Sequence, residues 1–92
     1  MMAEAATKIG KTDFLVFNEL RRSQNRFGAF TPEELAKTLK LEVRDLEVSL
    51  SKLTKRGVVT EFDFLDIGRN RYAISEQGIQ DAVKVEAEAN GQ

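Results

Sequence analysis

The period of the apolar residues changes at Gly57, and no other feature of the sequence constrains the fold as strongly. Before Gly57, apolar residues recur every three or four positions, which predicts a helix over residues 43–56. These residues are Val43, Leu46, Leu50 and Leu53. After Gly57, charged and apolar residues alternate in the second half of residues 58–65, which predicts a strand. Gly57 itself suits a helix C-cap, where the left-handed conformation favours glycine. The fold class is therefore α+β, with helix predominating.

A hairpin and a last helix are predicted after this strand. The turn-forming residues 66–70 separate it from a second strand over residues 71–74. Ser75 can then cap a final helix. The apolar residues of that helix are Ile79, Ala82, Val83 and Val85. The remaining residues are predominantly polar, so we expect the helix to fade into a tail.

Two helices are predicted upstream. Thr31 begins the clearer one, because Pro32 follows at the first helical position and Glu34 can bond back to the cap amide. Leu35, Ala36 and Leu39 form its buried side. An earlier helix is expected to begin at Thr12 as its N-cap and to be ended by Asn25 and Gly28.

Length and composition exclude several classes of function. With 92 residues the chain is a single domain, for which we expect a flexible N-terminal arm over residues 1–11, a folded domain over 12–84 and a polar tail over 85–92. There is no Cys and no His, so a thiolate nucleophile, the commonest general base and the commonest metal ligand are missing, and an enzyme would have to work with carboxylates, Lys, Tyr or Ser. We expect no enzymatic activity, no metal and no cofactor. Neither a signal peptide nor a membrane span is visible, which predicts a soluble cytoplasmic protein.

Residues 12 to about 84 resemble the winged helix-turn-helix family in the broad sense that includes MarR-like, ArsR-like and PadR-like regulators. The matching segments are TPEELAKTLKL, VRDLEVSLSKLTKRG and GRNRYAISEQG. The resemblance implies a three-helix core, a β-hairpin wing and a C-terminal helix. It also implies sequence-specific binding of double-stranded DNA by a transcriptional regulator, such as a repressor, in the cytoplasm and associated with the nucleoid.

The resemblance implies that helix 43–56 enters the major groove and that the wing, residues 61–74, lies on the backbone or minor groove. The outward residues of the helix are Arg44, Val48, Ser51, Lys52 and Lys55, and those of the wing are Arg69, Asn70 and Arg71. Arg44 can pair with guanine O6 and N7, whereas Lys52 and Lys55 suit phosphates.

Acidic residues leave other functions open. The net charge of the chain is −1. The last 17 residues carry −3, so the rest of the chain carries +2. Carboxylates that would repel phosphate are Glu42, Asp45, Glu47, Glu61 and Asp63. A protein-interaction module of the same fold is therefore an alternative, with Phe64 and Leu65 as its partner surface. A centromere-binding protein for plasmid or chromosome segregation is another.

Two-fold dimers usually read specific operators, so we expect a homodimer. Its interface would involve Phe14 in the first helix, or Ile79 and Val83 in the last. The six phenylalanines have helical or strand spacing, and we expect them to pack mainly in the core; they are Phe14, Phe17, Phe27, Phe30, Phe62 and Phe64.

Overall fold

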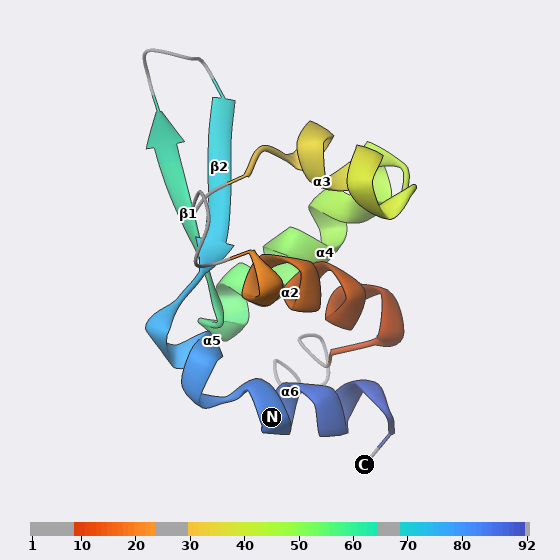
Figure 1. Ribbon diagram of the computed structural model, residues 1–92, viewed down its shortest axis with the longest axis vertical. Coiled ribbons are helices and arrows are strands. Elements are labelled where there is room, and N and C mark those ends of the chain that lie inside the picture. Colours follow the sequence, from red (N-terminus) through yellow and green to blue (C-terminus); the bar gives the residue numbers. More distant parts are fainter. Residues whose placement is uncertain (1–8, 24–29, 65–68, 92) are drawn as a thin grey trace.

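The computed structural model describes residues 9–23, 30–64 and 69–91, which form five helices and one two-stranded sheet (Figure 1). The elements are α2 (Lys11–Arg22), α3 (Pro32–Leu39), α4 (Val43–Arg56), β1 (Val59–Phe64), β2 (Arg69–Ile74), α5 (Glu76–Gln80) and α6 (Ala82–Ala89). In Figure 1, α2 lies between α4 and α6, and the hairpin extends from one end of the molecule. This is the winged helix-turn-helix arrangement expected from the sequence.

Local capping fixes α3 and α4 where the sequence placed them. The side chain of Thr31 accepts a hydrogen bond from the amide of Glu34, whose carboxylate accepts one from the amide of Thr31. Lys40 ends α3 in the left-handed conformation (φ 59°), which turns the chain directly into α4. Gly57 ends α4 at φ 87°, a conformation that glycine adopts without strain.

The first helix differs from its predicted bounds. Its N-cap lies two residues earlier, at Gly10 rather than Thr12, because Asp13 accepts the hydrogen bond of the Gly10 amide. It ends at Arg22, before the expected stops at Asn25 and Gly28, which lie outside the described residues. Ile9 is buried, so the described end of the expected N-terminal arm belongs to the core.

The hairpin is anchored to the helices at its base. Strands β1 and β2 pair antiparallel, with Glu61 opposite Tyr72. Tyr72 also exchanges two backbone hydrogen bonds, of 2.9 and 2.7 Å, with Phe30, the residue that precedes the cap of α3. This isolated bridge joins β2 to the beginning of α3 and thereby positions the wing beside the helical core.

The C-terminal segment is two helices rather than one helix and a tail. Ser75 caps α5, as expected, by accepting from the amide of Gly78, and its hydroxyl donates to the carbonyl of Gly57. A Cβ at Gly78 would lie 2.2 Å from the carbonyl oxygen of Val58, so only glycine permits this approach. Helix α6 continues to Ala89, and residue 85 is not the beginning of a tail: Val85 and Ala89 are buried.

The core lies where α2, α3, α4 and α6 meet. Its largest buried side chains include Phe17, Leu20, Leu35, Leu46, Leu50, Leu53 and Val85. Phe14 and Phe30 pack against this core, but Phe62 is 43% exposed, contrary to its expected place in the core. Phe27 and the side chain of Phe64 lie outside what the structure describes. Across the described ranges, no helix has the length and apolar character that crossing a membrane requires.

Candidate nucleic-acid interface

Helix α4 has one buried side and one outward side. Leu46, Ser49, Leu50 and Leu53 are buried against the other helices. On the opposite side Arg44, Val48, Ser51 and Lys55 are exposed. These four residues follow one another at spacings of four, three and four, so they form a single line along the helix, which we call the α4 stripe. The stripe has a cation at each end, with the apolar side chain of Val48 and the hydroxyl of Ser51 between them.

A cleft and a carboxylate flank the α4 stripe on each side. On the α2 side, a cleft of about 350 Å³ is lined by Gly10, Lys11, Thr12, Asp13, Asp45, Val48, Ser49 and Lys52. On the wing side, a cleft of about 380 Å³ is lined by Glu47, Ser51, Thr54, Lys55, Glu61 and Tyr72. The α4 stripe thus lies between two clefts. Asp45 lines one cleft and Glu47 lines the other, so neither carboxylate belongs to the stripe itself.

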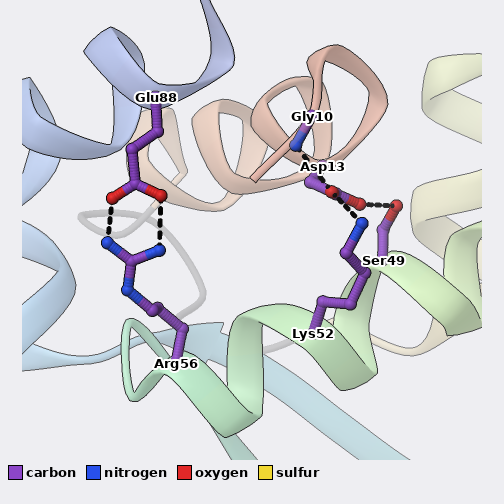
Figure 2. Close-up of polar contacts among 6 residues, drawn as sticks. All are labelled: Gly10, Asp13, Ser49, Lys52, Arg56 and Glu88. Atoms are coloured by element: carbon purple, nitrogen blue, oxygen red, sulfur yellow. Dashed lines mark hydrogen bonds and ion pairs between the residues drawn. The ribbon is translucent and has the colours of Figure 1, made fainter. Parts of the chain in front are cut away.

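Lys52, predicted to contact phosphate, is engaged in an ion pair inside the molecule instead. Its ammonium lies 2.7 Å from the carboxylate of Asp13, whose side chain is only 6% exposed. The same carboxylate accepts hydrogen bonds from Ser49 Oγ at 2.6 Å and from the Gly10 amide at 2.8 Å (Figure 2). Lys52 therefore joins α4 to the beginning of α2 and does not belong to the outward stripe.

The three donors decide the charge state of Asp13. Burial by itself would raise the pKa of this carboxyl group, but the hydrogen bonds from Lys52, Ser49 and Gly10 outweigh it and hold the pKa below its usual value. Asp13 is therefore ionised at neutral pH. A fully paired buried carboxylate of this kind is stable only while every partner is present.

A second ion pair holds α4 one turn further along, at its C-terminal end. Arg56, in the last turn, binds Glu88 of α6 through both terminal nitrogens, with Nη1 2.6 Å from Oε1 (Figure 2). The hydrogen bond to Arg56 lowers the pKa of Glu88 despite partial burial, and the pairing raises the pKa of Arg56. Such two-pronged pairs fix the relative orientation of their helices as well as their separation. Figure 2 shows that α4 is held at two points, by α2 and by α6.

The wing residues pair with carboxylates in the structure. Asn70 Nδ2 and the Tyr72 hydroxyl both donate to Glu61, the latter at 3.1 Å. Burial, followed by the hydrogen bond to Glu61, raises the pKa of Tyr72 to about 12. Arg71 lies 3.4 Å from Glu34 of α3. The side chains of Arg69 and Asp63, and all of Leu65, lie outside the described residues.

The residues predicted for a dimer interface have unequal exposure. Val83 is 80% exposed and Ile79 49% exposed, whereas Phe14 is half-buried and packs against the core. The two exposed residues lie on α5 and α6, at the lower end of the molecule in Figure 1. An apolar contact between copies is thus available at the C-terminal helices.

Sequence reasoning missed Asp13, Ser49 and Glu88. Asp13 lies in the first turn of α2, where acidic residues are common. That position alone does not indicate its contacts with Lys52 and Ser49 of α4. Ser49 carried a usable signal, because it is a hydroxyl residue on the apolar side of α4 and must find a buried partner. Among the described residues, no cluster of three or more acidic side chains could hold a metal ion.

Comparison with known proteins gives structural matches only: no protein-family model and no curated protein matches the sequence. The fold is similar to the ST1889 protein from Sulfolobus tokodaii, with 25% identity and a TM-score of 0.70, over 97% of this chain and 84% of that one. It is also similar to a possible transcriptional regulator from Methanosarcina mazei, with 26% identity and a TM-score of 0.66, over 98% and 80% of the two chains.

A third similar structure is a mutant of MarR from E. coli complexed with operator DNA, with 19% identity and a TM-score of 0.68. The match covers 84% of this chain, which spans only 53% of that one. These likenesses establish the winged helix-turn-helix fold. The Methanosarcina mazei protein is a possible transcriptional regulator, and the MarR structure holds operator DNA.

Proposed function

We propose that this chain is a small sequence-specific DNA-binding protein that regulates transcription as a homodimer. The observation that carries the proposal is the α4 stripe, which presents Arg44, Val48, Ser51 and Lys55 outward from a helix of the winged fold. A helix of this kind fits the major groove of B-DNA. The operator DNA bound by the similar MarR structure supports the same use of the fold here.

The two cations of the α4 stripe have different tasks in this proposal. Arg44, in the first turn of α4, pairs with the O6 and N7 of a guanine. Lys55, in the last turn, contacts phosphate beside the wing-side cleft. Lys52 does not contact phosphate in this proposal, because its ammonium is held by Asp13.

The wing contributes backbone or minor-groove contacts through Arg69, Asn70 and Arg71. Arg71 is able to exchange its partner, because Glu34 is 51% exposed and the pair is 3.4 Å apart. Exposed pairs of this kind are worth about 1 kcal/mol or less. A phosphate oxygen could therefore take the place of Glu34 beside Arg71.

A titration with labelled duplex DNA from the region upstream of its own gene tests the proposal. The logarithm of the affinity should fall with the logarithm of the salt concentration, by about 0.9 for each phosphate neutralised. Arg44→Ala should cost about 1–3 kcal/mol and relax specificity, whereas Lys55→Ala should weaken binding to all sequences and lower the salt slope by about 1.

Lys84→Ala is the matched control, because it removes an equal charge from the exposed side of α6. It should leave affinity and salt slope nearly unchanged. Absence of binding at low salt, or equal effects of the three substitutions, would contradict the proposal.

A protein-interaction module remains the second candidate, favoured by the exposed carboxylates of Asp45, Glu47 and Glu61 around the α4 stripe. It predicts that Arg44→Ala leaves function intact while substitutions at Phe64 or Leu65 abolish partner binding. Loss of DNA binding in Arg44→Ala would decide against it.

A further inference from the structure

Val48 is an apolar side chain at the middle of the α4 stripe. It is 57% exposed, and Arg44 and Ser51 beside it on the stripe are exposed as well. The other large exposed apolar residues of the described chain lie on different elements; they are Leu15, Phe62, Ile79 and Val83. Val48 is therefore the one large apolar group that α4 itself presents to solvent within the described residues.

Neither packing nor helix propensity explains a valine here. The side chain lies on the side of α4 opposite the buried leucines, so it adds little to the core. A β-branched residue also forms helix less readily than alanine or the long polar residues. However, valine strongly prefers one side-chain rotamer in a helix, so its two methyl groups are held in place before any partner arrives.

Base edges in the major groove are polar except at one group. Thymine presents its 5-methyl group there, beside the O4 acceptor, whereas unmodified cytosine, guanine and adenine present no methyl. An aliphatic side chain without donors or acceptors gains most from that methyl group. Phosphates and polar base edges offer Val48 no comparable contact.

We propose that Val48 packs against the 5-methyl group of a thymine and makes α4 select for that base. The inference rests on the proposed function, since it requires α4 to lie in the major groove. Four residues separate Val48 from Arg44, a rise of about 6 Å along the helix. Base pairs are about 3.4 Å apart, so the selected thymine lies within about two base pairs of the guanine read by Arg44.

The test uses a duplex selected from a randomised library by the wild-type protein. Each thymine of the selected duplex is replaced in turn by deoxyuridine, which removes only the methyl group, and binding is measured by fluorescence anisotropy. At one position in each half-site, the wild-type affinity should fall about fourfold, which corresponds to about 0.8 kcal/mol for one buried carbon group. The other thymines are controls within the same DNA and should be neutral.

Val48→Ala supplies the second arm of the test. This variant should bind the thymine duplex about as weakly as the wild type binds the uracil duplex, and it should no longer distinguish the two. Its thermal unfolding midpoint should be unchanged or raised, because alanine favours the helix. A merely structural valine would lower that midpoint instead.

Two outcomes overturn the inference while leaving DNA binding in place. One is a wild-type protein that is indifferent to deoxyuridine at every position. The other is a Val48→Ala variant that remains as sensitive as the wild type. Failure to select any salt-sensitive duplex would contradict the proposed function, and this inference with it.

Discussion

Asp13 links the beginning of α2 to α4. Its carboxylate gathers three donors, two of them from α4, although Ser49 lies 36 positions away in the sequence. The sequence could place Asp13 in the first turn of a helix, because that position follows from local rules. It could not reveal the partners, because the crossing of α2 over α4 determines them.

Replacing Asp13 should destabilise the fold. Asp13→Asn removes the charge that pairs with Lys52 and leaves a single acceptor oxygen for Ser49 and the Gly10 amide. We therefore expect the free energy of unfolding by urea at pH 7 to fall by about 1.5–3 kcal/mol. Glu33→Gln is the matched control, because Glu33 is an exposed acid in the first turn of α3, and its effect should stay within about 0.5 kcal/mol. Equal effects of both substitutions would contradict the assigned role.

The same carboxylate should make the free energy of unfolding depend on pH in the acidic range. The pKa of Asp13 is lower in the folded chain than its ordinary value of 3.8, so the folded state binds this proton less readily than the unfolded state does. The contribution is therefore complete above about pH 4 and is lost as the pH falls through the folded pKa. The stability difference between wild type and Asp13→Asn should shrink below pH 4, and a constant difference would contradict this.

Tyr72 gives a direct optical test of the wing contacts. It is the only tyrosine and the chain has no Trp, so absorbance of the phenolate reports this residue alone. We expect a titration midpoint near the value of about 12 set by burial and Glu61, and near 10 after unfolding. Glu61→Gln should lower the folded midpoint. A midpoint near 10 in the native protein would contradict the contact.

At the scale of elements, prediction succeeded where local signals determine the ends. The bounds of α4 follow from its apolar spacing and from Gly57, and the beginning of α3 follows from the Thr31 capping box. The end of α6 does not, because residues 85–91 are mostly polar or small. Burial of Val85 and Ala89 among the other helices extends that helix beyond what its own sequence favours.

Helix α6 should therefore contribute to stability. Val85→Ala creates a cavity in the core, where Val85 has no exposed surface, and should cost about 2 kcal/mol in thermal or urea unfolding. Val48→Ala is the same substitution at an exposed helical position and should cost nothing. If the two variants were equally stable, residues from 85 onward would be a tail after all.

At the scale of the whole molecule, α4 is joined to the helix that carries the proposed dimer contact. Arg56 binds Glu88 of α6, and Val83 lies on the same helix with 80% of its surface exposed. The pairing fixes the orientation of α6 relative to α4. In a homodimer it would thereby determine how the two α4 helices face the DNA, whose half-sites lie about one turn apart.

Val83→Glu should separate the dimer without unfolding the protomer. Two carboxylates brought together at a two-fold contact repel each other, whereas an exposed position tolerates the charge in the monomer. Sedimentation should show half the wild-type mass, circular dichroism should be unchanged, and affinity for a two-half-site duplex should fall much more than affinity for one half-site. A dimer that persists in this variant would exclude this interface.

Binding of DNA by the outward side of α4 can be followed by the amide chemical shifts during titration with a selected duplex. We expect the largest shifts at Arg44, Val48, Ser51 and Lys55 and in the wing, with small ones on the buried side of α6. Shifts that leave the α4 stripe unchanged while DNA is bound, or no shifts at all, would contradict it.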